Sequence, residues 1–400
     1  MRISTSMLNE LAVNGILQDQ AALSQTQNQL STGKSVNTPA DNPVAAVQLL
    51  QLNNTDSQYQ QYISNGQSAN TNQTLEEQAL SSSTTTLQSI RDLVVQANSG
   101  TNNATDLKNI ATQISALESQ LQGTANSQNA QGEYLFAGYS TGTQPFVRAS
   151  SGSMTYLGDS GASSVPINGG TSVQTGDPGS AVYMNIPAGN GTFTTAASAS
   201  NTGTGIIDAG SVTSQSAWVP GQYTITFSDA TDYTVTDGTG ATVASGSYNS
   251  ANGGEIAFDG IQAGITGAPA AGDTFTIAPS GTQSAFNTLD NLVSALSNAG
   301  SSAAARAQLS SALGGSLQQI DQALNQVSTV TSNVGSRISL ISSVNNSLTS
   351  ASTTVAGQIS NLSDVNYAAA TAQYSQEYLA LQAAEQSYAD INQLSLFKYL

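Results

Sequence analysis

The chain lacks cysteine and histidine entirely over its 400 residues. This absence excludes disulfides, thiolate nucleophiles, imidazole bases and the usual zinc sites. Charged residues make up only 8% of the sequence, against roughly 25% in an average globular domain. The net charge is −17, because eight Lys and Arg face 25 Asp and Glu. No basic patch is available to displace counterions from nucleic acid or to bind an anionic membrane surface, so we expect neither partner.

The sequence also has no long apolar run. Its first seven residues contain no apolar segment of the kind that marks a secretory signal peptide. No stretch offers the roughly 20 apolar residues that a membrane-spanning helix needs, so we expect no membrane insertion. A protein exported through a dedicated channel would show the same pattern, and secretion therefore stays open at this point.

A heptad pattern runs from Leu317 to Leu362. Its positions follow one another at alternating spacings of three and four residues, which only a helix brings onto one face. Most positions are apolar, and the polar exceptions are Thr331, Asn345 and Ser352. No proline interrupts the stretch. A helix of this length with one apolar face needs another long helix as its partner.

The phase of this pattern slips near Ser363 and Asp364. A second seam follows at seven-residue spacing and consists of Tyr367, Tyr374, Leu381 and Tyr388, with Tyr378 and Ile391 beside it. One interpretation of these tyrosines is a core stripe. The other is an interface between subunits, because the phenol combines apolar area with a hydroxyl that suits partly wet contacts.

The N-terminal part of the chain predicts the partner helices. A first helix carries on one face Val13, Ile16, Leu23 and Leu30, with Gln20 and Gln27 as polar interruptions. A turn with two prolines follows, in which Asp41 or Asn42 caps a second helix that begins at Pro43. That helix carries Val44, Val47 and Leu50. Further helical patterns, joined by a short turn near residues 99–103, predict an antiparallel helix pair.

From about Tyr139 to Ser280 the helical period disappears, and glycine, threonine and serine dominate. Alternating apolar and polar residues at 223–227, 233–235 and 274–277 predict half-buried strands. Glycine-rich turns separate these stretches. The segment is therefore predicted to be an all-β insert, and a division into two modules near 201–210 stays open.

We therefore predict an α+β fold, in which both termini build a long antiparallel helical coiled-coil rod and an all-β, Gly/Thr-rich central domain is inserted. The expected divisions are an N-terminal assembly helix over 1–40, the N-terminal part of the rod over 41–140, the β-rich insert over 141–284, the C-terminal part of the rod over 285–362 and a C-terminal assembly helix over 363–400.

Gly33-Lys34-Ser35 has the ending of a phosphate-binding loop. That motif requires a second glycine five residues before Gly33, and Asn28 stands there. We therefore interpret the stretch as the turn that ends the first helix.

Two acidic groups also invite a functional interpretation. Asp229, Asp232 and Asp237 lie close together, but they lack the bidentate glutamate of a calcium loop and are better explained as turn residues beside strands. Glu76 and Glu77 are adjacent on a helix and diverge by about 100°, so we expect solvated side chains and no acid–base pair. We expect no catalytic residue, no cofactor and no metal ion.

Several stretches resemble the flagellin family of bacterial axial proteins. Residues 30–43 resemble the turn between the family's first two helices, and residues 132–146 resemble the exit from its helical rod into the β insert. The start at 1–5 and the end at 364–400 are similar to the branch of the family that forms the hook–filament junction. The resemblance covers residues 1–146 and 285–400 and leaves the rest of the insert unassigned.

The resemblance implies a structural, non-enzymatic protein that is exported through the flagellar type III apparatus and lies in the extracellular flagellum, at the hook–filament junction. The implied partners are other copies in a ring-like layer, the first hook-associated protein, flagellin and an export chaperone. It also implies that the terminal helices become ordered only among neighbouring copies. A filament subunit, flagellin, is the alternative. A glycan-binding or enzymatic role of the β insert is a further alternative.

The residues expected at the assembly interface lie in the two terminal helices, where apolar and aromatic side chains recur on helical faces. They are Val13, Ile16, Leu23, Leu30, Tyr367, Tyr374, Tyr378, Leu381, Tyr388, Ile391, Leu394 and Phe397.

Overall fold

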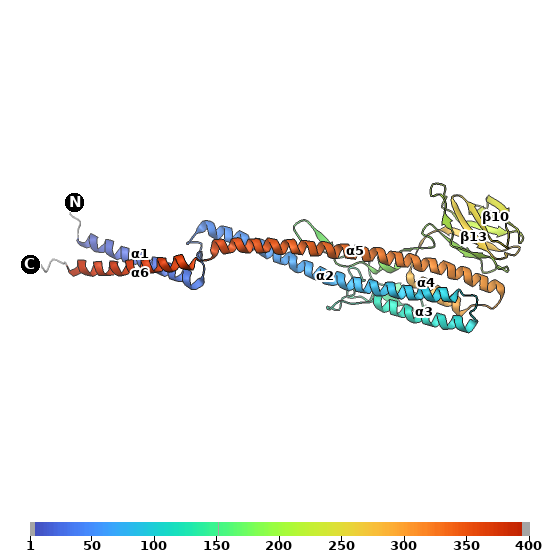
Figure 1. Cartoon of the computed structure of the whole chain (residues 1–400), viewed down its shortest axis with the longest axis horizontal. Helices are drawn as coiled ribbons and strands as arrows, with labels where there is room; N and C mark the ends of the chain where they lie inside the picture. Colours follow the sequence, from blue (N-terminus) through green and yellow to red (C-terminus); the bar gives the residue numbers. More distant parts are fainter. Residues whose placement is uncertain (1–4, 151, 394–400) are drawn as a thin grey trace, which may run out of the picture. The chain divides into compact units, whose positions relative to one another are not determined.

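The computed structural model describes residues 5–150 and 152–393 (Figure 1). The chain divides into a terminal unit, which comprises the described residues up to Ser64 and from Val344 onward, and a central unit of residues 65–343. Its helices are α1 (Thr5–Thr32), α2 (Pro43–Ala97), α3 (Ala104–Ala125), α4 (Ala285–Ser297), α5 (Ala303–Ser363) and α6 (Tyr367–Gln393). Among the helices described, none combines the length and the apolar character that crossing a bilayer requires.

In the terminal unit, α1 and α6 run side by side in opposite directions (Figure 1). Each helix buries or half-buries a row of positions at three- and four-residue spacing, as in a coiled coil. On α1 this row is Asn9, Ala12, Ile16, Asp19, Leu23, Thr26 and Leu30. On α6 it is Ala370, Tyr374, Glu377, Leu381, Ala384 and Tyr388. Because many of these side chains are small or polar, the seam buries little apolar area per turn and stabilises the pair only modestly.

This arrangement corrects the polar interruptions that the sequence predicted for the α1 seam. They are Asn9, Asp19 and Thr26, whereas Gln20 and Gln27 are exposed. In the structure α1 and α6 are helical and paired within one chain. The expectation that these helices become ordered only among neighbouring copies stays a prediction.

The break between α5 and α6 lies where the heptad pattern slips. The amide of Ser35 donates a hydrogen bond to the carbonyl of Ser363 at 2.6 Å, and the amide of Val365 donates to the carbonyl of Gly33 at 2.9 Å. These bonds pair the α1–α2 turn with the α5–α6 turn in antiparallel fashion. Gly33 has a φ of +72°, a conformation that favours glycine. The stretch that looked like a phosphate-binding loop is therefore a structural turn.

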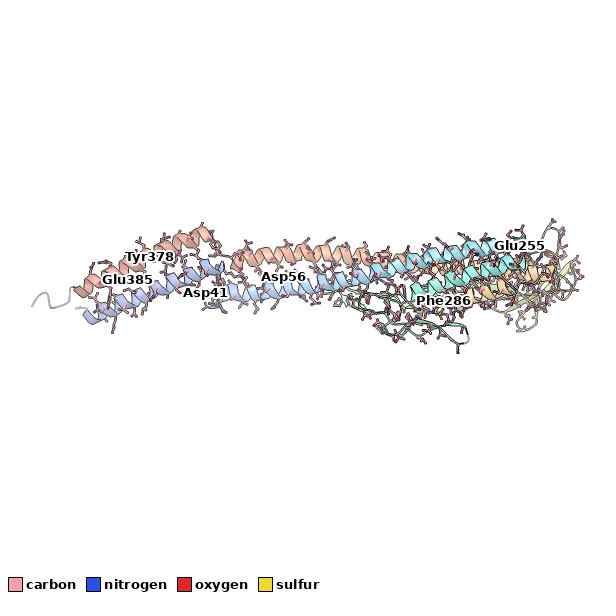
Figure 2. All side chains as sticks on the ribbon, turned by 90° about the horizontal axis from the view of Figure 1, so that it is seen from below. Asp41, Asp56, Glu255, Phe286, Tyr378 and Glu385 are labelled. Atoms are coloured by element: carbon pink, nitrogen blue, oxygen red, sulfur yellow. The ribbon has the colours of Figure 1, made fainter. Side chains whose placement is uncertain are left out.

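The first part of α2 and the last part of α5 share a second seam in the terminal unit. The Oδ1 of Asn42 accepts a hydrogen bond from the amide of Ala45 at 3.0 Å, which confirms a cap immediately before Pro43. Ser352, a polar position of the predicted seam, donates a hydrogen bond from its hydroxyl to Asp56 at 2.6 Å. Asp56 lies in the first part of α2 (Figure 2). Every position of the heptad pattern from Leu317 to Leu362 is buried or half-buried, as predicted.

In the central unit, α2, α3, α4 and α5 contribute to one apolar core. Its fully buried members include Leu87, Ile114, Leu121, Leu289 and Val327. The first part of the β insert joins this core through an aromatic cluster of Phe136, Phe146, Tyr183 and Phe286, with neighbouring ring centroids 5.2 to 5.9 Å apart. The elements of this first β module are β1 (Phe146–Arg148), β2 (Met154–Tyr156), β3 (Ser164–Pro166), β4 (Ser172–Gln174), the π-helix η1 (Ser180–Met184), β5 (Ile186–Pro187) and, beside β5, β15 (Thr282–Gln283).

The second β module has a core of its own. A five-stranded antiparallel sheet has the order β11 (Thr242–Ser247), β10 (Asp232–Asp237), β9 (Tyr223–Phe227), β14 (Thr274–Pro279) and β6 (Phe193–Ala197). A four-stranded sheet consists of β12 (Gly254–Phe258), β13 (Ile261–Thr266), β7 (Ile206–Ile207) and β8 (Ser211–Val212). The alternating stretches of the sequence form β9, β10 and β14, as predicted.

The boundary between the two β modules differs from the division near 201–210 that the sequence left open. β6 pairs with β14 along its whole length and therefore belongs to the second module, so the boundary falls before Phe193. The predicted fold class is confirmed, because helices from both ends of the chain pair with each other and a β-rich segment is inserted between them.

Candidate assembly interface

The predicted interface residues of the terminal unit fall into two groups. Six of them are half-buried in the seam between α1 and α6, where they hold the two helices of one copy together: Ile16, Leu23, Leu30, Tyr374, Leu381 and Tyr388. The structure thus assigns these side chains to the pairing of the two ends of one chain.

The other six residues are exposed, or their side chains lie outside the described residues. Val13, Tyr367 and Tyr378 are exposed to solvent. Tyr378 lies on α6 (Figure 2). Its ring stacks on that of Tyr374, with centroids 6.4 Å apart and an interplanar angle of 10°. Ile391 belongs to α6, but its side chain lies outside the described residues, as do Leu394 and Phe397 altogether.

The apolar residues that the sequence predicted on the second helix form an exposed row near the start of α2 and do not belong to a seam. Val44, Val47 and Leu50 are 69%, 57% and 63% exposed. Their three-residue spacing places them on one side of the helix, away from the seam positions Ala45 and Leu49. We call these three residues the α2 row. A second apolar stripe beside the seam stripe was the signal that could have identified it.

Further large apolar side chains are exposed on the other two helices of the terminal unit. They are Met7, Leu8, Leu11 and Leu17 on α1 and Leu379 on α6. Soluble monomers rarely gather so many exposed apolar side chains in one region, and such surfaces commonly mark contacts with other chains. The terminal unit therefore presents more apolar surface than its own seams cover.

The turn between α1 and α2 is fixed by one carboxylate. Asp41 accepts hydrogen bonds from the amides of Asn37 and Thr38, at 3.0 and 2.7 Å, and from the side chain of Gln25 on α1 at 3.1 Å. The amide of Thr38, followed by that of Asn37, lowers the pKa of Asp41, so the group stays ionised in this turn. The start of α2, which carries the α2 row, is thereby tied to α1.

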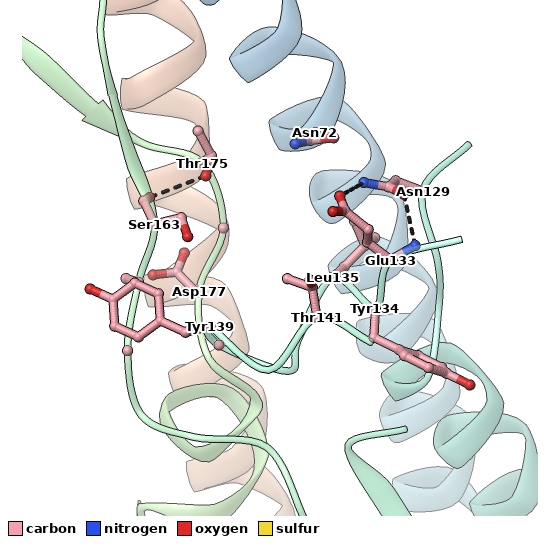
Figure 3. Close-up of a pocket in the computed structure, with 14 residues that line it drawn as sticks. Asn72, Asn129, Glu133, Tyr134, Leu135, Tyr139, Thr141, Ser163, Thr175 and Asp177 are labelled. Atoms are coloured by element: carbon pink, nitrogen blue, oxygen red, sulfur yellow. Dashed lines mark hydrogen bonds between the residues drawn. The ribbon is translucent and has the colours of Figure 1, made fainter. Parts of the chain in front are cut away.

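A polar cavity of about 240 Å³ lies in the central unit (Figure 3). Asn72, Asn129 and Glu133 line one side of it, and Tyr139 and Asp177 line the other. Both carboxylates have structural partners. Glu133 accepts a hydrogen bond from Asn129 at 2.8 Å, and Asp177 forms an ion pair with a neighbouring arginine of α5.

The burial of Glu76, next to this cavity, contradicts the prediction that its side chain is solvated. Glu77 is exposed, as expected for a solvated residue, but Glu76 is only 1% exposed. It is buried because it occupies a seam position of α2, between Gln73 and Leu80 at spacings of three and four residues. The heptad phase of α2 was the signal that could have placed it inside.

Asp229 and Asp237 serve turns, as predicted, whereas Asp232 is the first residue of β10. The Oδ1 of Asp229 accepts hydrogen bonds from the amides of Thr231 and Asp232, and the Oδ1 of Asp237 accepts from that of Thr239. Across the part of the chain that the structure describes, no group of three or more Asp or Glu side chains gathers at metal-binding distance.

Comparison with known families finds flagellar proteins along most of the chain. The family model of the bacterial flagellin N-terminal helical region matches residues 3–141, and that of the C-terminal helical region matches residues 317–400. The model of the D2-like domain of flagellar hook-associated protein 1 matches residues 196–279. This last match falls on the second β module, where the sequence offered no resemblance.

Individual relatives are similar to the chain over different lengths. Flagellar hook-associated protein 3 of Salmonella typhimurium is 33% identical over 186 residues, which are 46% of this chain and 58% of that protein. The crystal structure of Xanthomonas campestris FlgL is 32% identical, with a TM-score of 0.71, over 76% of this chain and 97% of that one. The crystal structure of hook-associated protein 3 from Legionella pneumophila is 29% identical, with a TM-score of 0.74, over 79% and 98%.

Proposed function

The chain belongs to the FlgL family of flagellar junction proteins, and on this basis we propose that it forms the structural layer that joins the flagellar hook to the filament. The match to the curated relative from Salmonella covers 58% of that protein's length. The role of the whole chain is therefore a proposal. The role is structural and needs neither a catalytic site nor a cofactor.

One observation supports the proposal most directly. The terminal unit exposes apolar side chains on three helices, while the seam between α1 and α6 buries little apolar area. Burying a side chain of the size of Val or Leu stabilises a contact by about 1.5 to 3 kcal/mol. The α2 row, Leu379 and Tyr378 thus offer apolar surface that neighbouring copies can bury. We propose that these side chains, together with Val13 and Tyr367, form the contacts between copies.

The remaining partners follow from the position of a junction layer. Such a layer contacts the first hook-associated protein on the hook side and flagellin on the filament side. We also propose that the chain leaves the cell through the flagellar type III apparatus, escorted by an export chaperone, and acts in the extracellular flagellum. The acidic, cysteine-free sequence fits this route, because no disulfide has to be opened before export.

The alternative is a filament subunit. The relatives reported above are two proteins named hook-associated protein 3 and one named FlgL, which favours the junction role over that of flagellin. Assembly behaviour distinguishes the two, because purified flagellin extends filament seeds into long polymers whereas a junction protein stops at a layer.

Deletion of the gene in its own organism tests the proposal. A junction protein is needed before filament growth, so the expected phenotype is intact hooks without filaments and unpolymerised flagellin in the medium. Complementation with the wild-type gene should restore attached filaments. Normal attached filaments in the deletion strain would contradict the junction role. Bare hooks without any excreted flagellin would instead support the filament-subunit alternative.

A further inference from the structure

Three segments of the central unit meet at a group of charged side chains, of which two carboxylates are buried and one arginine is half-buried. Glu76 comes from α2, Asp177 from the loop between β4 and η1, and Arg337 from α5. Arg337 donates two hydrogen bonds to the carboxylate of Asp177, at 2.7 and 3.1 Å. The backbone amide of Asp177 donates to Oε1 of Glu76 at 2.9 Å. The group therefore ties the first β module to both long helices.

The charges of this group do not balance when all three side chains are ionised. Two carboxylates then share one guanidinium, and Glu76 is almost fully buried. A buried charge without its own partner is strongly unfavourable. A proton on Glu76 removes the excess negative charge. Glu76 is then neutral, and the charges of Asp177 and Arg337 cancel. Burial, and after it the charge of Asp177, raises the pKa of Glu76 to about 8, in the direction that this balance requires.

Gln73 is the polar neighbour of Glu76 on α2. Its Nε2 lies 3.1 Å from Oε2 of Glu76, while its Oε1 is buried without a hydrogen-bond partner. The two ends of an amide are interchangeable by a half-turn about its last torsion. Gln73 can therefore donate to an ionised Glu76 or accept from a protonated one, and Glu76 keeps this hydrogen-bonding neighbour in either state.

The other titratable groups around Glu76 do not compete for this proton. On α2, Glu77 is exposed. On η1, burial raises the pKa of Tyr183, whose hydroxyl is 2.7 Å from that of Ser83, so the phenol stays neutral. In the segment that follows α3, Glu133 lines the cavity together with Asp177 but is exposed. Glu76 is therefore the group whose ionisation changes the charge of the buried cluster.

We propose that Glu76, Asp177 and Arg337 form a proton-dependent latch, which holds residues 174–187 against α2 and α5 while Glu76 is protonated and loosens when Glu76 ionises. The closed state binds one proton more than the open state between the ordinary value of 4.5 and about 8. The contribution of the Glu76 proton to the latch is therefore full below about 4.5, decreases as the pH rises through this window and changes no further above it. This device is independent of the assembly role.

Amide hydrogen exchange of residues 174–187 in the full-length protein tests the latch. Protection factors, corrected for the intrinsic exchange rate, should fall by up to about tenfold per pH unit between pH 5.5 and about 8. Glu76→Gln keeps the shape of the side chain but cannot ionise, so its protection should not change with pH. Glu77→Gln, one residue along on the exposed face, is the matched control and should follow the wild type.

Protection of this segment that is independent of pH in the wild type would overturn the proposal. So would a Glu76→Gln variant that loses protection as the wild type does. If Glu76→Gln does not fold, the wild type alone decides the question through the ¹³C resonances of its glutamate carboxyl groups. One glutamate should titrate with a midpoint near 8. A titration in which every glutamate has its midpoint below pH 6 would refute the latch.

Discussion

Arg148 on β1 lies between two carboxylates that come from different helices. It contacts Glu118 of α3 directly and donates to Asp290 of α4 at 2.7 Å. Glu118 is buried. Burial, followed by the charge of Asp290, raises the pKa of Glu118, whereas Arg148 lowers it. The guanidinium of Arg148 thus compensates the negative charge of the buried Glu118 carboxylate.

We expect Arg148→Met to lower the free energy of unfolding by about 2 kcal/mol at pH 7, because Glu118 loses its counter-charge. Urea unfolding measures this loss. The deficit should shrink as the pH falls, since a protonated Glu118 no longer needs the guanidinium. Arg306→Met, at an exposed position, is the control and should cost less than about 0.5 kcal/mol. Equal effects of the two substitutions would contradict this role of Arg148.

The long seams are the elements that periodicity predicted best. The spacing of the α5 seam, the break near Ser363 and the cap at the start of α2 all follow from local rules of helix geometry, which one sequence displays directly. The α1 seam was placed less well. Asp19 and Thr26 occupy it, and a polar residue in a seam is indistinguishable in the sequence from a polar residue on the surface.

Features that depend on distant pairing could not be predicted. The boundary of the second β module is set by the pairing of β6 with β14, about 80 residues apart in the sequence, and no local pattern announces such a partner. The docking of Asp177 onto Glu76 and Arg337 depends likewise on segments that lie far apart. The burial of Glu76 could have been predicted, because the heptad phase of α2 places this residue in a seam.

Asn345 is a polar position of the α5 seam whose side-chain Oδ1 is buried without a hydrogen-bond partner. We expect Asn345→Leu to raise the free energy of unfolding by about 1 kcal/mol, because it replaces an unsatisfied acceptor with an apolar side chain. Thermal unfolding measures the gain. Asn346→Leu, at the exposed neighbouring position, should leave stability nearly unchanged. A loss of stability in Asn345→Leu would show that the amide has a role that the seam geometry does not reveal.

The tyrosines of α6 should separate pairing within a copy from contact between copies. Tyr374 and Tyr388 are half-buried against α1, whereas Tyr378 is 48% exposed. Tyr374→Ala with Tyr388→Ala should loosen the α1–α6 pair and lower incorporation into the flagellum. Tyr378→Ala should lower incorporation while the helix content by circular dichroism stays unchanged. Loss of helix content in Tyr378→Ala would contradict the assignment of this residue to contacts between copies.

At the scale of the whole molecule, the two units differ in how much of their apolar surface they bury. The central unit buries large aromatic and aliphatic side chains in two cores. The terminal unit joins both ends of the chain through narrow seams and leaves apolar rows on α1, α2 and α6 in solvent. The central unit therefore buries most of its large apolar side chains by itself, whereas the terminal unit leaves many of them exposed. In the proposed junction role, neighbouring copies cover this exposed apolar surface.

The measurement that tests this account most directly is the incorporation of a variant with Val44→Ser, Val47→Ser and Leu50→Ser, scored by electron microscopy of flagella in a strain that lacks the native gene. These side chains point away from the seams, so circular dichroism and thermal unfolding of the purified variant should match the wild type. Val219→Ser, a similarly exposed valine in the second β module, is the control and should restore attached filaments. The account predicts that the triple variant is exported but leaves hooks without filaments. Attached filaments at the wild-type frequency would contradict it.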